Sequence, residues 1–223
     1  MGLLQRQLSQ KWQVITASIQ PGSTRSVSLR VKILLGFSVI FSIGFAGAFF
    51  WFYTFTTEKT LSRLRVDMKS VLVGAAQGID VQELLALYAD GKPNAVGFSD
   101  DPRFQHQLAW FQTIHSIEPR AWLYTYTFGK ANSNRRVGQP AVEPNQLEII
   151  YLVDLWSKFN PAKSVRFLEP GVPGQVTYQV IEHGTIVDTP EIYTDKWGTW
   201  LSAFAPLKDT QGNVVAILGV DIQ

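Results

Sequence analysis

The stretch ILLGFSVIFSIGFAGAFFWFYTFT (residues 33–56) runs for 24 residues without a charged side chain. An apolar helix of about 20 residues is long enough to cross the hydrocarbon core of a lipid bilayer. The stretch therefore predicts a transmembrane helix over 33–56, with the membrane as a partner of the chain. Its second half is rich in Phe, Trp and Tyr, whose rings favour the interface between lipid and water.

The residues before this stretch predict its orientation. Residues 1–32 carry five Lys and Arg side chains and no Asp or Glu. Because basic residues beside a span resist translocation, we expect 1–32 to be a cytoplasmic leader and 57–223 to lie outside the inner membrane. A cleaved signal peptide is the alternative, because Ala46-Gly47-Ala48 resembles a cleavage site. The long basic region and the continued apolar run favour an uncleaved anchor.

The composition of residues 57–223 limits the function classes. All 18 acidic residues but only 15 of the 20 Lys and Arg fall in this part. Nucleic acid is not an expected partner, because phosphate binding requires a concentrated basic surface. The chain has no cysteine, so it has no disulfide, thiolate nucleophile or Cys-ligated metal. It also lacks a P-loop, a dinucleotide fingerprint and a nucleophile elbow. We expect no enzyme activity in these residues and no cofactor or metal.

Helical patterns come first after the span. A helix is expected from Glu58 to about residue 77, and a second begins at the Asp80 cap and ends near Gly91, where glycine takes the left-handed conformation. Asp101-Pro102 predicts the start of a third helix, which ends before Pro119. A fourth, over 174–183 and closed by a glycine, competes with a strand there.

Strand patterns dominate the rest of the chain. Aromatic residues alternate with smaller ones over 122–128, and an apolar run covers 147–156. A turn at 160–163 is expected to lead into a short helix. The segments 198–207 and 214–222 flank a polar turn that contains Gly212, which predicts a hairpin. Helices followed by antiparallel strands indicate an α+β domain, with a long emerging helix and then a central antiparallel sheet flanked by helices.

The emerging helix carries an apolar stripe at alternating steps of three and four residues. The stripe consists of Leu61, Leu64, Met68, Val71 and Ala75. It either packs on its own domain or pairs with a second copy in a parallel homodimer. Fewer than three heptads are present, which favours packing on the domain for at least part of the stripe. A homodimer is nevertheless an expected partner arrangement, with the stripe as its seam.

Two closing segments carry a family resemblance. YTDKWGTWLSAFAPL (193–207) and GNVVAILGVDI (212–222) resemble extracytoplasmic PAS-like sensor domains of the Cache family. PRAWLYTY (119–126) and DLW (154–156) are similar to segments of such sensors in bacterial, including cyanobacterial, adenylate cyclases, diguanylate cyclases and histidine kinases. The resemblance spans residues 34–222.

The resemblance implies the N-terminal sensor part of a signal-transduction receptor. In that family a second span, a HAMP linker and a cytoplasmic output domain usually follow. We expect any cyclase or kinase output domain to lie downstream, or the output to run through a partner. The amino-acid-binding motif of the family is matched only in part by Arg120-Ala121-Trp122-Leu123, because leucine replaces a tyrosine. Amine recognition is therefore not carried over from the family.

Candidate ligand-binding residues come from three places in the sequence. The aromatic face of 122–128 suits one wall of a small-molecule pocket, with acidic and basic anchors nearby, although large rings also pack ordinary cores. A second aromatic and acidic group at 193–200 either closes a pocket and holds a cation by ring faces or clamps a loop to its own domain. Asp221, in an apolar strand, either faces the pocket or binds backbone donors. The candidates are Arg120, Trp122, Tyr124, Tyr126, Asp154, Tyr193, Trp197, Trp200 and Asp221.

Together these patterns predict a membrane-anchored sensor that binds a small extracytoplasmic molecule and relays a signal across the membrane. We expect Trp122, Tyr124, Tyr126 and Trp200 to line one cavity. An interaction or structural protein with the same fold and no ligand is the alternative. It would show a filled core and an exposed apolar patch in place of the cavity. An anchored hydrolase would require a nucleophile, a base and an orienting group within reach of each other.

Overall fold

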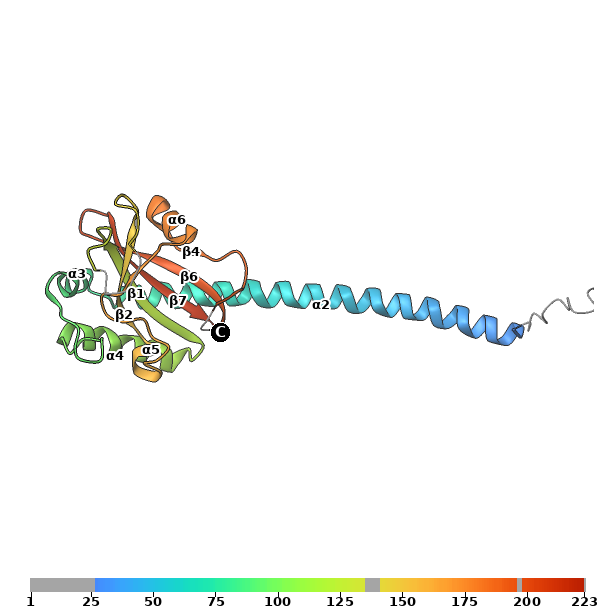
Figure 1. Cartoon of the computed structure of the whole chain (residues 1–223). Coiled ribbons are helices and arrows are strands. Elements are labelled where there is room, and N and C mark those ends of the chain that lie inside the picture. The colour runs from blue at the N-terminus through green and yellow to red at the C-terminus, as the bar shows by residue number, and fades with distance from the viewer. Residues whose placement is uncertain (1–26, 135–140, 196–197, 223) are drawn as a thin grey trace, which may run out of the picture. The chain divides into compact units, whose positions relative to one another are not determined.

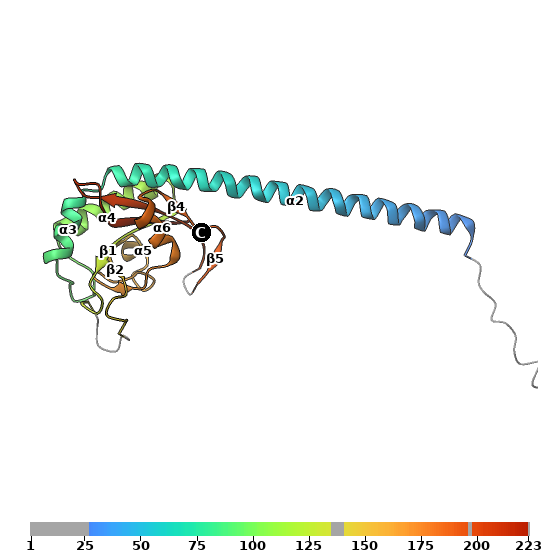
Figure 2. The same cartoon turned by 90° about the horizontal axis from the view of Figure 1, so that it is seen from above.

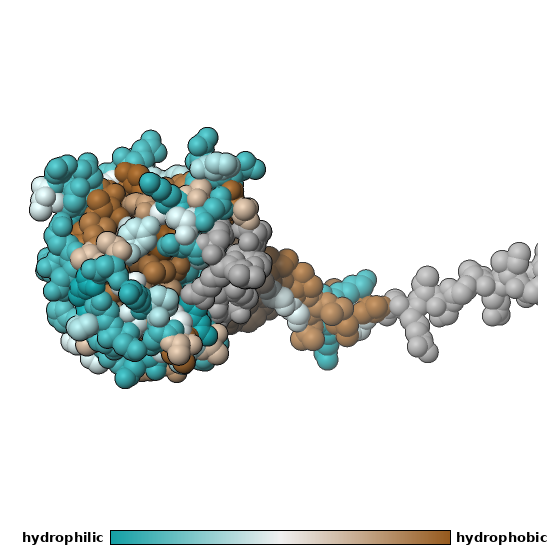
Figure 3. Space-filling model, turned by 60° about the vertical axis from the view of Figure 1, so that its left-hand side comes forward, coloured by the Kyte–Doolittle hydropathy of each residue, from teal (hydrophilic) through white to brown (hydrophobic). Residues whose placement is uncertain are grey.

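The computed structural model describes residues 27–134, 141–195 and 198–222 (Figure 1). The chain divides into two units, Met1–Thr57 and Glu58–Gln223. Among the described residues, one helix is long and apolar enough to cross a membrane, by its length and composition alone. This helix is α2 (Leu29–Gln77), which confirms the helices expected over 33–56 and from Glu58. The exposed surface of its apolar part is mostly brown in Figure 3, whereas the visible face of the second unit is mainly teal.

The part of α2 that belongs to the second unit turns its apolar stripe toward the domain core. Met68, Leu72 and Ala75 are completely buried, and Leu64 and Val71 pack against the same core. The buried members of the stripe are therefore not available as the expected homodimer seam. They cover a sheet face within their own chain instead, because burying them there removes the same apolar surface from water.

Two shorter helices follow α2. Helix α3 (Val81–Asp90) begins as predicted, with the Asp80 carboxylate accepting hydrogen bonds from the N–H groups of Gln82 and Glu83. Gly91 at its end has a φ of −63° and an extended conformation, so the predicted left-handed glycine is wrong. Helix α4 (Pro102–Ile117) begins with the predicted proline and ends before Pro119.

An antiparallel sheet forms the centre of the domain (Figures 1 and 2). Its order is β3-β2-β1-β7-β6-β4, and β5 pairs with β6 beside this path. The strands are β1 (Ala121–Gly129), β2 (Glu148–Asp154), β3 (Pro170–Gly171), β4 (Val187–Asp188), β5 (Tyr193–Thr194), β6 (Thr199–Lys208) and β7 (Val214–Ile222). The α+β class, the first two long strands and the closing hairpin are as predicted. Gly212 in the hairpin turn has a φ of +87°, which favours glycine.

The two faces of β1 have different neighbours. Thr125 on one face accepts a hydrogen bond at 3.1 Å from the amide of Gln107 in α4. Tyr126 points to the opposite face, where its hydroxyl lies 3.1 Å from the Thr177 hydroxyl in α6 (Gln175–His183). Successive side chains of a strand point to opposite faces. The rings of Trp122, Tyr124 and Tyr126 therefore share one face of β1, as the sequence predicts. Helix α6 also ends as predicted, at a left-handed Gly184 with a φ of 59°.

The segment after β2 differs from the prediction. The strand ends at Asp154, and helix α5 (Trp156–Phe159) follows at once, before the turn at residues 160–163 and not after it. The Asp154 carboxylate accepts a hydrogen bond from the Trp156 N–H at 3.0 Å. This side-chain bond offers the backbone an alternative to the strand ladder, which ends the strand early.

Candidate functional site

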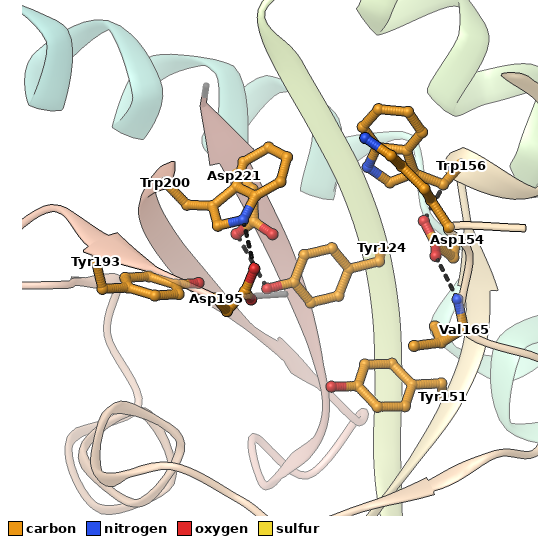
Figure 4. A pocket seen from close by; sticks show the side chains of 10 residues that line it. Tyr124, Tyr151, Asp154, Trp156, Val165, Tyr193, Asp195, Trp200 and Asp221 are labelled. Carbon is orange, nitrogen blue, oxygen red and sulfur yellow. Dashed lines mark hydrogen bonds between the residues drawn. The ribbon is translucent and has the colours of Figure 1, made fainter. Parts of the chain in front are cut away.

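A cavity of about 140 Å³ opens beside the Tyr124 side of β1 (Figure 4). Its walls come from β1, β2, β6 and β7, from α5 and the loop after it, and from β5 and the residue after it. The lining residues are Tyr124, Tyr151, Asp154, Trp156, Lys163, Val165, Tyr193, Asp195, Trp200 and Asp221. The lining thus combines five aromatic rings with three carboxyl groups and one ammonium group.

A glycine on the neighbouring strand makes room for the central ring. Tyr124 on β1 lies opposite Gly219 on β7. A Cβ atom at Gly219 would lie 2.5 Å from Cζ of the Tyr124 ring, which is closer than atoms can approach. The tyrosine therefore lies flat across β7, and its hydroxyl reaches the Asp221 carboxylate at 3.2 Å. Gly219 thus fixes the position of a lining residue although its own atoms do not line the cavity.

The Asp221 carboxyl group is the most strongly perturbed acid of the cavity. Its Oδ1 accepts hydrogen bonds from the Ser202 hydroxyl at 2.5 Å and from the Tyr124 hydroxyl at 3.2 Å. Burial raises its pKa from the ordinary 3.8 to about 7, against the lowering effect of these two bonds, and the negative charges of Asp154 and Asp195 raise it further. The group is therefore half ionised near neutral pH and gains from a nearby positive charge.

The Asp154 carboxyl group accepts hydrogen bonds at both of its oxygens. Its Oδ1 accepts the Trp156 N–H, and its Oδ2 accepts the Ser164 hydroxyl at 2.9 Å and the Val165 N–H at 3.0 Å. Burial raises its pKa to about 6, and the three hydrogen bonds keep it from rising further. Asp154 is accordingly a carboxylate at neutral pH, and its donors order the wall that carries Trp156 and Val165.

The opposite wall is organised by Asp195. Its Oδ1 accepts hydrogen bonds from the indole N–H of Trp200 at 3.0 Å and from the Gly198 N–H at 3.1 Å. These bonds join the residue after β5 to the start of β6 beside the cavity, as Figure 4 shows for Asp195 and Trp200. Tyr193 on β5 completes this wall, and its hydroxyl lies 2.9 Å from the Ser202 hydroxyl.

The tyrosines of the cavity are neutral. Burial raises the pKa of Tyr193 to about 12 and moves the pKa values of Tyr124 and Tyr151 still further above their usual range. Lys163 contributes the one ammonium group of the lining, and its Nζ lies 5.4 Å from the centroid of the Trp156 ring. The charged groups of the lining are thus three acids against one base.

Five of the nine residues singled out from the sequence line the cavity, namely Tyr124, Asp154, Tyr193, Trp200 and Asp221. Trp122 lies behind the lining, stacked on Trp156 with ring centroids 3.7 Å apart and planes at 9°. Tyr126 is buried against α6. The expectation that these two rings line the cavity beside Trp200 is therefore wrong, because Trp156 of α5 covers Trp122 and α6 covers Tyr126.

The other two candidates lie elsewhere. Arg120 is exposed and forms an ion pair with Glu118, with its Nε 2.7 Å from the carboxylate. Trp197 lies outside the described residues. Asp195, which belongs to the aromatic and acidic group at 193–200, also lines the cavity. The structure further adds four lining residues that the sequence did not single out: Tyr151, Trp156, Lys163 and Val165. The polar hydroxyl of Tyr151 inside an otherwise apolar run was the one available signal for this group.

The arrangement offers several groups that can bind a small molecule. None of the three histidines lines the cavity, and the Ser202 hydroxyl is buried and donates to the Asp221 carboxylate. In the part of the chain that the structure describes, no group of His, Asp and Glu side chains has a spacing suited to a metal. A positively charged molecule is the ligand class that an excess of carboxylates and exposed ring faces favours.

Comparison with protein-family models gives no match to this chain, and comparison with curated proteins gives none either.

Proposed function

We propose that this chain is a membrane-anchored extracytoplasmic sensor that binds a small organic cation in the cavity and relays its occupancy toward the membrane. The lining of the cavity is the observation that carries the proposal. Three carboxyl groups, one ammonium group and five aromatic rings surround a space of about 140 Å³. Ligand recognition is the use that this lining supports.

Charge decides which ligand class binds. A cation about 4 Å from one carboxylate gains about 4 kcal/mol at the effective dielectric constant of a partly exposed site. A ring face adds about 0.5–2 kcal/mol. An anion of the same size meets three carboxyl groups and only Lys163 in its favour. Cations are therefore preferred over anions and over neutral molecules of the same shape.

Volume limits the size of the ligand. A closed apolar cavity of about 150 Å³ accommodates benzene. The cavity here has nearly the same volume, so a single ring or a short alkyl chain with an ammonium group fills it. A ring-bearing ammonium ion would place its ring among the five aromatic side chains and its charge beside Asp221.

The fold and the membrane helix support the sensor assignment. The segments that resemble Cache domains form the β6–β7 hairpin of an antiparallel sheet, and β7 carries Asp221. The architecture proposed for this chain is a PAS-like sheet flanked by helices. The proposed role of the chain is the sensor part of a cyclase or histidine kinase receptor. Its N-terminus lies in the cytoplasm, because the five basic residues before the span have no acidic counterpart.

Binding is tested with the full chain in lipid nanodiscs by calorimetry and tryptophan fluorescence. The probes are benzylammonium, tetramethylammonium, neutral benzyl alcohol and anionic benzoate at pH 7.5. We expect a cation to bind and benzoate not to bind, and Asp221→Asn to weaken cation binding at least tenfold. Glu118→Gln removes a carboxylate outside the cavity and serves as the matched control. Equal affinity for cation and neutral analogue, or equal loss in both variants, would contradict the proposal.

Orientation is tested separately with alkaline phosphatase fusions, which are active only outside the cytoplasm. A fusion after Arg25 should be inactive and a fusion after Ile222 active. The reverse pattern would place the cavity in the cytoplasm and remove the extracytoplasmic part of the proposal.

A further inference from the structure

Two basic side chains of α2 hold the segment Asp188–Pro190. Lys69 Nζ lies 2.6 Å from the Asp188 carboxylate, and Arg65 Nε lies 3.5 Å from its other oxygen. The Arg65 guanidinium also donates to the backbone carbonyls of Thr189 and Pro190. Figure 2 shows β4, which ends at Asp188, beside α2. The segment thus takes its position from the helix that also carries the candidate membrane span.

The same segment is bonded on its other side to Ser202 in β6. The Thr189 N–H donates to the Ser202 carbonyl at 2.8 Å, and the Ser202 N–H donates to the Thr189 hydroxyl at 3.1 Å. Both residues are buried. Since each backbone group of Ser202 has its partner on Thr189, a displacement of one residue displaces the other.

The side chain of Ser202 belongs to the cavity network. Its hydroxyl donates to Asp221 at 2.5 Å and lies 2.9 Å from the Tyr193 hydroxyl. Because the Ser202 proton is given to Asp221, the Tyr193 hydroxyl is the donor toward Ser202. One buried residue therefore joins the carboxylate that faces the cavity to the segment that α2 holds.

We propose that Ser202 is a positioning residue. It couples the Asp221 carboxylate to the contacts that Arg65 and Lys69 make with Asp188–Pro190. A cation beside Asp221 competes for the oxygen that accepts the Ser202 hydroxyl. The resulting change in that bond shifts Ser202, and with it the Thr189 carbonyl that Arg65 binds. The role of the ligand rests on the proposed function, whereas the coupling between Asp221 and α2 does not require a ligand. Coupling is reciprocal, so loosening α2 must also change the affinity of the cavity.

The coupling is tested first without any ligand. The unfolding equilibrium constant of the full chain is measured in urea for Arg65→Met, Asp221→Ala and the double variant, because alanine removes the oxygen that accepts the Ser202 hydroxyl. Independent sites combine multiplicatively to within about twofold. We expect the unfolding equilibrium constant of the double variant to differ more than threefold from the value that the two single effects predict when multiplied. When Ser202→Ala is present in every variant, this difference should fall below twofold. If Arg65→Met does not fold, Lys69→Met, whose ion pair is more exposed, replaces it.

Arg103→Met provides the control, because Arg103 pairs with Asp90 and Asp101 and touches no residue of this route. The effects of Arg103→Met and Asp221→Ala should combine multiplicatively. A multiplicative Arg65 and Asp221 cycle, or a departure that persists with Ser202→Ala, would overturn the assignment.

The second arm uses benzylammonium as the probe. Arg65→Met should change its dissociation constant at least threefold, and Arg103→Met less than twofold. Absence of cation binding together with a coupled cycle would reject the ligand class and leave the coupling intact. Cation binding with a multiplicative cycle and no effect of Arg65→Met would reject the coupling and leave the ligand class intact.

Discussion

Replacing Asp221 with asparagine should stabilise the folded protein above neutral pH. Asparagine has the shape of the aspartate side chain, and its carbonyl oxygen still accepts the hydrogen bonds of Ser202 and Tyr124. It carries no charge, so the cost of burying a carboxylate disappears. Its amide group faces the cavity, where water or a ligand can bind it.

The magnitude follows from the pKa of the buried acid. Folding raises the pKa of Asp221 from 3.8 to about 7. At about 1.4 kcal/mol per pKa unit, ionising this group in the folded state costs about 4 kcal/mol. Allowing for imperfect hydrogen bonds of the amide, we expect Asp221→Asn to raise the free energy of unfolding by about 2–4 kcal/mol at pH 8.

The pH dependence gives the decisive signature. Between pH 4 and pH 7 the unfolded chain has lost the Asp221 proton while the folded protein keeps it, so the stability of the parent protein falls as pH rises. The variant lacks this proton, and its advantage should grow across this window and level off above the folded pKa. Urea unfolding followed by tryptophan fluorescence at pH 4 to 8.5 measures the difference. A difference that does not change with pH would refute the reasoning.

Asp154→Asn is the matched comparison and should leave the free energy of unfolding at pH 8 close to that of the parent protein, because the gain of about 3 kcal/mol from removing a carboxylate whose pKa is raised to about 6 is offset by a lost hydrogen bond. Both Asp154 oxygens accept hydrogen bonds, from the N–H groups of Trp156 and Val165 and from the Ser164 hydroxyl. An asparagine amide would oppose the Val165 N–H with a second donor, which leaves a buried group unsatisfied and costs about 1–3 kcal/mol. Two stabilising substitutions would show that burial alone, and not the number of donors, sets the outcome.

Three further substitutions test the packing. Gly219→Ala places a methyl group against the Tyr124 ring and should cost about 1–3 kcal/mol of stability and reduce binding of benzylammonium, measured by urea unfolding and calorimetry. Met68→Ala should cost about 2–5 kcal/mol because Met68 is fully buried, whereas Val66→Ala on the exposed face of α2 should stay within about 0.5 kcal/mol; equal effects would show that the stripe does not face the core. Gly212→Ala should cost about 1 kcal/mol or more, since its φ of +87° disfavours alanine; an unchanged urea midpoint would contradict this.

Local sequence patterns predicted most of the elements because short-range physics forms them. The Asp80 and Asp101 caps, the alternation along β1 and the glycine in the β6–β7 turn each depend on neighbours within a few residues. The prediction of a left-handed Gly91 at the end of α3 was wrong, because the chain continues there in an extended conformation. The α5 helix was misplaced, because an Asp154 side chain ends β2 before the apolar run does.

The cavity was only partly predictable for a related reason. The alternation along β1 correctly predicted that Tyr124 lines the cavity. The same alternation predicts this equally for Trp122 and Tyr126, which α5 and α6 cover. Which of three equivalent rings stays uncovered depends on elements far away in the chain. Lys163 and Val165 lie in a loop without a periodic signal, and their contacts with the cavity arise only when that loop folds back on β2.

The position of β7 between β1 and β6 sets the order in which the domain can be assembled. Strand β1 ends at Gly129, and its partner on that side starts only at Val214. During synthesis, one edge of β1 stays unpaired and Tyr124 has no glycine to lie on until β7 is made. The sheet is therefore completed only after β7 has been synthesised, and not progressively from the first strand. Its long-range pairing makes folding slow, and it leaves an exposed strand edge for chaperones or proteases to bind in the meantime.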